Sequence, residues 1–402
     1  MSETRFRQVI GQGPAYWGGV AVLALVALAG VVASRRMEEL GHVITGMNNQ
    51  IVWGMPHVFA VFLIVAASGS LNVASIASVF GRVDYKPLAR LSGLLAMALL
   101  AGGLAILVLD LGRPDRIGVA MTHYNFRSIF AWNILLYTGF LTITAVYLWV
   151  QMEPRLSGST RTVGTAAFLW RLILTTGTGS IFGFLAARDT WDAAIMAPMF
   201  IAMSLSVGQA IFILVLMAAC RWTGRPLGDA LLQRLKNLLG VLVAAVLYFL
   251  LAFHLTKIYN AKYHAVEYFL LVDGHPYAAL FWCGVVFLGG VLPLALFYLP
   301  ALRASRPAIV AGALTIVAGG LTLVYVIIIG GQAYPLALFP GRQVASSFAD
   351  GAINAYAPSL PECVLAVGGT ALALLIVLLA VRLFGFLPES LSDHPAGSGA
   401  RR

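Results

Sequence analysis

Ten apolar runs of about twenty residues recur along this 402-residue sequence, and they constrain its fold more than any other feature. A run of this length spans the hydrocarbon core of a bilayer as an α-helix, because lipid cannot satisfy an exposed backbone. The predicted spans cover residues 15–34, 54–80, 89–110, 126–150, 164–188, 194–220, 237–256, 278–300, 307–329 and 361–384. We therefore expect an all-α polytopic membrane protein with about ten transmembrane helices.

The composition supports this prediction and excludes other classes of protein. Hydrophobic residues make up 60% of the chain and charged residues only 10%, whereas a soluble domain carries about 25% charged residues. The three cysteines, Cys220, Cys283 and Cys363, form no C-x-x-C motif, so neither a disulfide framework nor a cluster held by this chain alone is expected. Although the net charge is +10, the Lys and Arg residues are dispersed, so nucleic acid is not an expected partner.

The distribution of Lys and Arg predicts the orientation. The N-terminus, the loops after even-numbered spans and the C-terminus hold 16 of these residues, and the other loops hold 9. By the positive-inside rule both termini are expected in the cytoplasm. The long loops 35–53, 111–125, 257–277 and 330–360 then lie on the periplasmic side, where docking or substrate sites would be built.

These predictions divide the chain into three parts. Residues 1–14 form a cytoplasmic N-terminus, residues 15–384 a single transmembrane domain, and residues 385–402 a disordered cytoplasmic tail. The first span is followed by Arg35 and Arg36 and has no A-x-A cleavage site, so we expect a retained helix and not a signal peptide.

Polar residues gather at the predicted periplasmic end of span 2. Asn49, Trp53 and His57 are spaced by four residues, so on a helix they would share one face. Pro56 would lie in the first turn, where its missing N–H costs little. The alternative is an interfacial tryptophan beside a structural histidine.

The end of span 3 carries a second group of candidate site residues. Asp110 ends an apolar run, and Arg113 is three residues further on, so the two could pair at the helix end. The alternative is a charge pair that only sets topology. Spans 2 and 3 are antiparallel, so Asp110 and Arg113 should lie near the residues of span 2.

This combination suits a quinone. A carbonyl needs a hydrogen-bond donor, the reaction needs a proton-exchanging group, and the ring needs an apolar slot. The two antiparallel spans would bring His57, Asn49 and Trp53 near Asp110 and Arg113, with His57 as a hydrogen-bonding group, Asp110 as a titratable group and Trp53 as an aromatic wall. No metal site is expected, because no ligand cluster with metal-binding spacing occurs in the sequence.

Further polar residues fall at the same predicted end, and we interpret most of them as solvated loop residues or docking contacts. They are Arg188, Asp189, Trp191, Asp192, His254, Lys257, Tyr259, Lys262, His264, Glu267, Gln332 and Glu362. A haem held between His57 and His254 is one alternative function. A secondary transporter is another, although the midplane charges typical of that class are missing.

The sequence also resembles a known family. Asp110-Leu-Gly-Arg-Pro114, followed by Tyr124-Asn-Phe-Arg-Ser128 and Trp132, resembles the NrfD/PsrC family of polysulfide-reductase membrane subunits. The stretch from Asn48 to Gly54 is similar to the ten-helix branch, which includes DsrP-type subunits of DsrMKJOP complexes and HybB-type hydrogenase subunits. The stretches 53–57 and 271–277 favour the DsrP type.

The resemblance implies two four-helix bundles, spans 2–5 and 6–9, with flanking helices. It implies a menaquinone or ubiquinone site near the periplasmic surface of a bacterial inner membrane, without haem or iron–sulfur cluster in this chain. Partners would be a ferredoxin-like periplasmic iron–sulfur subunit and other membrane and cytochrome subunits of a respiratory or sulfur-metabolism complex. By motif, Asp110 would exchange the proton, His57 and Asn49 would bind the carbonyls, and Arg113 would orient Asp110.

Overall fold

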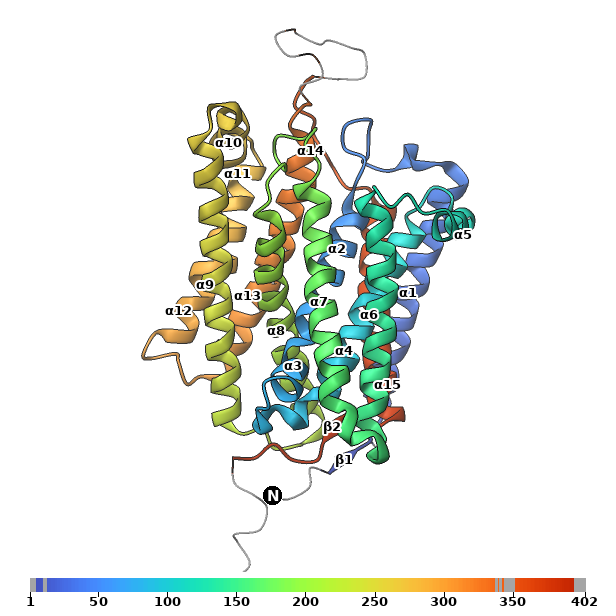
Figure 1. Ribbon diagram of the computed structural model, residues 1–402, viewed down its shortest axis with the longest axis vertical. Coiled ribbons are helices and arrows are strands. Elements are labelled where there is room, and N and C mark those ends of the chain that lie inside the picture. The colour runs from blue at the N-terminus through green and yellow to red at the C-terminus, as the bar shows by residue number, and fades with distance from the viewer. Residues whose placement is uncertain (1–4, 10–12, 337–338, 340–341, 343–350, 394–402) are drawn as a thin grey trace, which may run out of the picture.

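The computed structural model describes residues 5–9, 13–336, 339, 342 and 351–393, and most of them lie in long helices packed side by side (Figure 1). Within these ranges nine helices are long and apolar enough to cross a membrane. The remaining predicted span is α7 (Thr160–Gly183), which is equally helical but is made more polar by its threonines and by Arg161 and Arg171. The protein is therefore an all-α, multi-pass membrane protein, as the apolar runs predict.

Four spans form the first bundle. They are α2 (Met55–Ser70) with its continuation α3 (Asn72–Ser78), α4 (Ala89–Leu109), α6 (Ile129–Met152) and α7. Each helix packs on the next, α2 on α4, α4 on α6, α6 on α7 and α7 on α2, so the four form a ring.

The second bundle repeats this arrangement with the spans that follow. It consists of α8 (Met196–Thr223), α9 (Asp229–Tyr259), the composite span α11 (Tyr277–Ala279), π-helix η7 (Leu280–Val291) and α12 (Leu292–Tyr298), and α13 (Arg306–Tyr325) with its extensions η8 (Val326–Gly330) and α14 (Gly331–Ala333). Helix α8 packs on α9, α9 on η7, η7 on α13 and α13 on α8. Together the two rings confirm the predicted pair of four-helix bundles.

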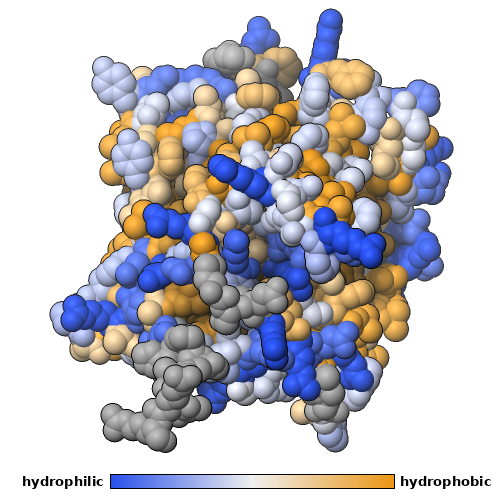
Figure 2. All heavy atoms as spheres, turned by 60° about the horizontal axis from the view of Figure 1, so that its bottom comes forward, coloured by the Kyte–Doolittle hydropathy of each residue, from blue (hydrophilic) through white to orange (hydrophobic). Residues whose placement is uncertain are grey.

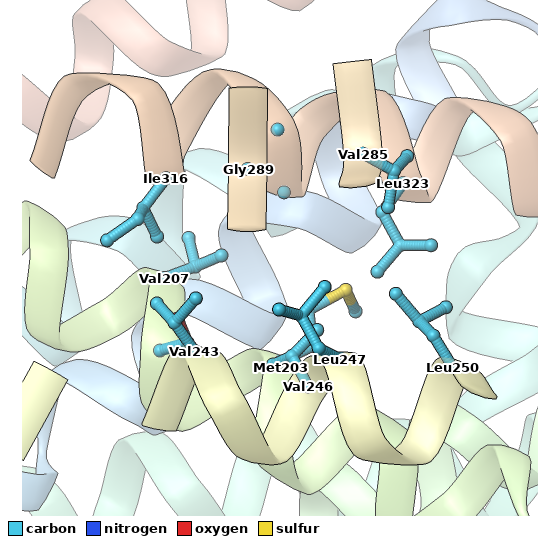
Figure 3. A pocket seen from close by; sticks show the side chains of 13 residues that line it. Met203, Val207, Val243, Val246, Leu247, Leu250, Val285, Gly289, Ile316 and Leu323 are labelled. Carbon is cyan, nitrogen blue, oxygen red and sulfur yellow. The ribbon is translucent and has the colours of Figure 1, made fainter. Parts of the chain in front are cut away.

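The interior of the second bundle is almost completely apolar. Figure 3 shows side chains from all four spans converging there: Met203, Val207, Val243, Val246, Leu247, Leu250, Val285, Gly289, Ile316 and Leu323. The cavity that they leave has a volume of about 20 Å³, which is room for one water molecule at most. This interior is therefore packed core.

The two bundles join where α2 crosses α8. A Cβ atom at Gly69 would overlap the backbone carbonyl of Ser204, and one at Gly208 would overlap the backbone of Ser70. Small residues at helix crossings let the two backbones approach closely in a membrane. The glycines therefore make the seam between the bundles possible.

Two further helices flank the bundles. Helix α15 (Leu360–Leu383) packs on α4 and α2 of the first bundle, and α1 (Pro14–Leu40) packs on the outer side of α15. Gly30 of α1 lies against Gly368 of α15, where an added Cβ would stand 3.0 Å from the Gly368 Cα. This pair of helices corresponds to the first and last predicted spans.

A short sheet joins the two ends of the described chain. Strand β1 (Phe6–Arg7) pairs antiparallel with β2 (Leu387–Pro388). Phe386 and Leu387 are buried, so the predicted disorder of the tail is wrong for residues 385–393. The rest of that tail, 394–402, and the first residues, 1–4, lie outside the described residues.

We call the end of the bundles that carries β1 and β2 the strand end and the opposite end the loop end. Short helices between the spans cap both ends. At the strand end they are η2 (Val83–Leu88) and η4 (Pro154–Ser159); at the loop end they are η1 (His42–Ile44), η3 (Pro114–Arg116), α5 (Ile117–Thr122), η5 (Ala261–Tyr263), α10 (His264–Tyr268) and η6 (Phe269–Asp273). Which end faces the cytoplasm stays a prediction from the charge distribution.

Candidate functional site

The first bundle holds a carboxylate–histidine pair at the loop end. His57 lies in the first turn of α2 and Asp110 follows the last residue of α4, so the antiparallel packing of these helices brings them together. Their Nδ1 and Oδ2 atoms are 2.8 Å apart, and the side chains are 21% and 1% exposed. The predicted proximity of the two residues is therefore observed.

The carboxylate of Asp110 forms no hydrogen bond with the described residues. Its backbone carbonyl accepts a hydrogen bond from His42 Nε2 at 3.2 Å, but both carboxylate oxygens and the facing His57 Nδ1 atom are buried without a hydrogen-bond partner among the described residues, so the 2.8 Å approach of His57 is a close contact without hydrogen-bond geometry. An unsatisfied buried carboxylate oxygen costs free energy unless a ligand, a proton or water satisfies it. It is an available acceptor beside the histidine.

The pair opens into a cavity of about 430 Å³ at the loop end. The lining mixes polar and apolar side chains: His42, Val43, Met47, Asn48, Asn49, Val52, His57, Asp110 and Gly112. Volumes of 300–1,000 Å³ are typical of small-molecule sites. Three predicted site residues, Asn49, His57 and Asp110, thus share one cavity, which we call the site cavity.

Trp53 connects the site cavity to the protein interior. Its ring stacks on the His57 ring with centroids 5.9 Å apart and on the Trp191 ring at 5.5 Å, with interplanar angles of 17° and 18°. Trp191 itself is buried and donates from Nε1 to the Ile327 carbonyl. The three rings form a continuous stack that holds His57 from its inner side.

The loop that carries Trp53 is held by the side chain of Gln332. The Oε1 atom of Gln332 accepts from the backbone N–H groups of Val52 and Trp53, both at 3.0 Å. Its Nε2 atom donates to the carbonyls of Trp53 and Ile328, both at 2.9 Å. Gln332 is completely buried, so the interpretation of most polar residues at this end as solvated or as docking contacts does not apply to it.

A half-buried arginine and a buried glutamate fix the same loop. Arg188 donates to the Gln50 carbonyl at 2.7 Å and to the Gln332 carbonyl at 3.2 Å. Glu362 at the start of α15 accepts from the Gly46 N–H at 2.7 Å and from the Tyr356 hydroxyl at 2.7 Å. Burial, and then the Glu362 carboxylate, raises the pKa of Tyr356, so its phenol stays protonated and can donate.

Two details of the predicted site are wrong. Asn49 and Trp53 do not lie on a helix with His57, because α2 begins at Met55 after an extended Gly54, and Pro56 occupies its first turn. Arg113 does not pair with Asp110. Helix α4 ends at Leu109, and Arg113 has φ −141° and ψ 69°, so the three-residue helical spacing is lost. Its guanidinium pairs instead with Asp115 at 2.8 Å, with its side chain 64% exposed.

The second bundle contains a similar pair near the loop end. His254 Nδ1 lies 2.6 Å from Glu267 Oε2, with side chains 11% and 3% exposed. The edges of Phe253 and Phe281 enclose the histidine ring, with centroids 4.9 and 4.8 Å away. The adjoining cavity has a volume of only about 30 Å³. This pair is therefore buried, and no ligand of the size of an aromatic ring can reach it.

The haem alternative is weakened by this geometry. His57 and His254, the two histidines that it would use, belong to different bundles, and each has its Nδ1 atom next to a carboxylate. Trp53 is stacked between His57 and Trp191, so the two imidazoles do not face one another. In the described part of the chain, no group of three or more His, Cys, Asp or Glu residues is arranged to hold a metal ion.

Comparison with known proteins identifies the family. Residues 43–336, which include both bundles and all residues that line the site cavity except His42, match the family described as polysulphide reductase, NrfD. The chain belongs to the NrfD family. This agrees with the resemblance carried by the residues after Asp110.

Relatives from three organisms match nearly the whole chain. The Hdr-like menaquinol oxidoreductase integral membrane subunit of Archaeoglobus fulgidus is 28% identical over 386 residues, which is 96% of this chain and 97% of that protein. A putative dimethyl sulfoxide reductase membrane subunit of Halobacterium salinarum is 28% identical over 397 residues, covering 91% and 90%. A selenate reductase subunit of Mesobacillus selenatarsenatis is 22% identical over 400 residues, covering 90% and 92%.

Proposed function

We propose that this NrfD-family protein is the quinone-binding membrane subunit of a multisubunit redox complex. The observation that carries the proposal is the site cavity, in which a buried carboxylate, with no hydrogen bond to either oxygen from the described residues, adjoins a partly exposed histidine. The name of the Archaeoglobus fulgidus relative, a menaquinol oxidoreductase subunit, supports the same reading.

The lining of the site cavity fits a quinone headgroup. Val43, Met47 and Val52 offer apolar surface for a ring, and Asn49 and His57 offer polar groups for its two oxygens. A volume of about 430 Å³ accepts a substituted aromatic ring of this kind.

The chemistry assigned to this chain is proton exchange. Oxidation of a quinol to a quinone releases two electrons and two protons, and reduction takes up the same number. In the oxidative direction His57 accepts the proton of one hydroxyl group, and Asp110, whose Oδ2 atom lies 2.8 Å from His57 Nδ1, accepts the proton of the other. In the reductive direction the pair returns both protons. Either way the electrons pass to or from a partner protein.

We assign the partner to the loop end, where the site cavity opens. An iron–sulfur subunit of the ferredoxin type, docked on these loops, would exchange the electrons, and further membrane and cytochrome subunits would complete the complex. A DsrP-type complex of sulfur metabolism in a bacterial inner membrane is our first assignment, and a HybB-type hydrogenase is the alternative.

A secondary transporter remains the competing function of another class. Helix α2 is interrupted at Leu71, and Arg171 is buried in the middle of α7, where it donates to Asn72 Oδ1 at 3.1 Å. A broken helix with a buried charge is typical of transporters. However, that signature requires corresponding features in both halves, and the interior of the second bundle is apolar.

The test replaces Asp110 in the intact complex. We expect Asp110→Asn to reduce electron transfer between quinol and the complex by about a hundredfold or more, because a proton-exchanging group contributes 10²–10⁴-fold to a rate. The set of proteins in the complex and its helicity should not change. The measurement is turnover with a reduced short-chain quinone, together with quinone extracted from the purified complex.

Asp115→Asn is the matched control, because Asp115 is an exposed acid five residues further along that pairs with Arg113 outside the site cavity. It should keep normal turnover. Wild-type rates in the Asp110→Asn complex would disprove the assigned role. A purified protein that carries neither quinone nor a redox partner would favour the transporter.

A further inference from the structure

A second large cavity lies at the strand end, on the opposite end of the protein from the site cavity. It has a volume of about 790 Å³ and lies between the last turns of α8 and the first turns of α13. Its lining residues are Leu214, Met217, Ala218, Cys220, Arg221, Arg225, Leu227, Arg306, Pro307, Val310, Ala311 and Leu314. We call it the arginine groove.

The walls of the arginine groove are apolar and face outward. Leu214, Met217, Val310 and Leu314 come from helices long and apolar enough to span a membrane, and Leu314 is 54% exposed. The groove therefore opens sideways, toward the hydrocarbon region that surrounds these helices. A hydrocarbon chain lying along it would bury this exposed apolar surface.

Three arginines form the rim at the end of the apolar walls. Arg225 is held by backbone carbonyls alone, donating to Leu387 at 2.8 Å and to Arg7 at 2.9 Å. Arg221 is exposed and has no hydrogen bond or ion pair with any described residue. Arg306 forms an ion pair with Asp229 at 2.8 Å, in which both side chains are substantially exposed. Among the residues that line the groove there is no acid; Asp229 pairs with Arg306 and Glu389 lies near Arg225, so three guanidinium groups face two carboxylates and the rim keeps a net positive charge.

Across the whole strand end, polar side chains lie next to apolar surface, as they do in the arginine groove. Figure 2, in which this end is turned forward, shows hydrophilic side chains gathered across it beside apolar surface. A guanidinium cluster placed where apolar helix surface stops matches the position of lipid headgroups. Basic pockets between membrane helices bind the headgroups of anionic lipids.

We propose that the arginine groove is a binding site for one anionic phospholipid. The lipid phosphate lies against Arg221 and Arg306, and a hydrocarbon chain follows the walls made by Met217, Val310 and Leu314. Such a lipid would join α8 to α13 at the strand end, where the two helices diverge enough to leave the cavity. The proposal does not depend on the function assigned to the site cavity.

The binding experiment uses the full-length protein, purified with its partners and stripped of lipid by detergent exchange. Phosphatidylglycerol, phosphatidylcholine and inorganic phosphate are titrated separately, and bound species are counted by native mass spectrometry. We expect phosphatidylglycerol to bind at least tenfold more tightly than phosphatidylcholine. Inorganic phosphate at the same concentrations should not bind, because it lacks the chain that fills the groove.

Three variants locate the lipid. Arg221→Gln should weaken phosphatidylglycerol binding about fivefold, as expected for one arginine near a phosphate. Val310→Trp, which fills the groove and keeps all three arginines, should abolish it. Arg161→Gln is the matched control, since Arg161 is an exposed arginine at the strand end that does not line the groove, and it should bind like wild type.

Each other result overturns the proposal. Equal affinity for the two lipids, or wild-type affinity in Arg221→Gln, would show that the rim does not recognise the phosphate. Binding of inorganic phosphate as tight as that of phosphatidylglycerol would make this a free-anion site. Unchanged lipid binding in Val310→Trp would place the lipid elsewhere, and a helix of a partner protein found in the groove would replace it as the occupant.

Discussion

Gln332 allows a strict test of what holds the site loop in place. It is completely buried, and its side chain makes four hydrogen bonds, to the N–H groups of Val52 and Trp53 and the carbonyls of Trp53 and Ile328. Methionine has a similar length and no comparable hydrogen-bonding groups. We therefore expect Gln332→Met to leave two N–H groups and the Trp53 carbonyl without their partner.

The magnitude follows from those three backbone groups. An unsatisfied buried group costs roughly 1–2 kcal/mol, so the loss should be about 3–6 kcal/mol if the loop keeps its conformation. If the loop moves instead, part of this cost disappears, but Trp53 is then released from the His57 ring. The substitution should therefore lower either stability alone or stability and quinone turnover together.

Gln209 supplies the matched control. It is also completely buried, but neither its Oε1 nor its Nε2 atom has a hydrogen-bond partner in the described part of the chain. Removing a buried polar group that makes no hydrogen bond should be neutral or stabilising. Gln209→Met thus makes the same chemical change at the same burial, but the expected change in stability is zero or positive and not negative.

The assay is thermal unfolding of both variants in one detergent at one heating rate, because unfolding of a large membrane protein is governed by kinetics. We expect the apparent midpoint of Gln332→Met to fall by several degrees and that of Gln209→Met to stay level or rise. Equal destabilisation by both variants would refute the reasoning, since it would show that burial and packing of the side chain matter and its hydrogen bonds do not.

Two further predictions use the same assay. Gly69→Ala should destabilise the protein by roughly 1–3 kcal/mol, because its Cβ would overlap the Ser204 carbonyl at the seam between the bundles. Gly18→Ala should not destabilise it, because a Cβ at that position meets no atom within 4 Å. Equal unfolding midpoints for the two variants would show that close packing at Gly69 does not stabilise the protein. In the second bundle, His254→Leu and Glu267→Gln should each destabilise the protein by about 3 kcal/mol, because each leaves its partner buried and unpaired. The double variant should lose much less stability than the sum of the two single variants. Additive losses in this double-mutant cycle would mean that the pair is not coupled.

The sequence predicts the spans because one physical property, the apolar run, decides them. Predicted and observed helices differ mainly at their ends, and α9 shows why. It begins at Asp229, eight residues before the predicted 237, because Arg234 and Lys236 can remain helical where the helix leaves the lipid. Hydropathy marks where a helix is buried in lipid, whereas hydrogen bonding decides where it ends.

The site was predictable only where two neighbouring helices supply it. His57 and Asp110 belong to consecutive antiparallel spans, so their proximity follows from the order of the spans. Gln332 lies about 280 residues from the loop that it holds, and nothing in the sequence indicates that pairing. The sequence could have indicated only that Gln332 is buried, because it follows the apolar residues Ile327, Ile328 and Ile329. A buried glutamine needs internal hydrogen-bond partners, but the sequence does not say which ones.

The two carboxylate–histidine pairs show why similar chemistry need not give similar function. His57–Asp110 and His254–Glu267 occupy comparable places in the two bundles, and each contains a carboxylate oxygen without a partner among the described residues. They differ in access, since the first lines a cavity of about 430 Å³ and the second adjoins one of about 30 Å³. Under the proposed function, a ring-sized substrate would therefore exchange its protons with the first pair. The second pair adjoins too little space for a quinone beside Phe253 and Phe281, so we assign the substrate site to the first bundle.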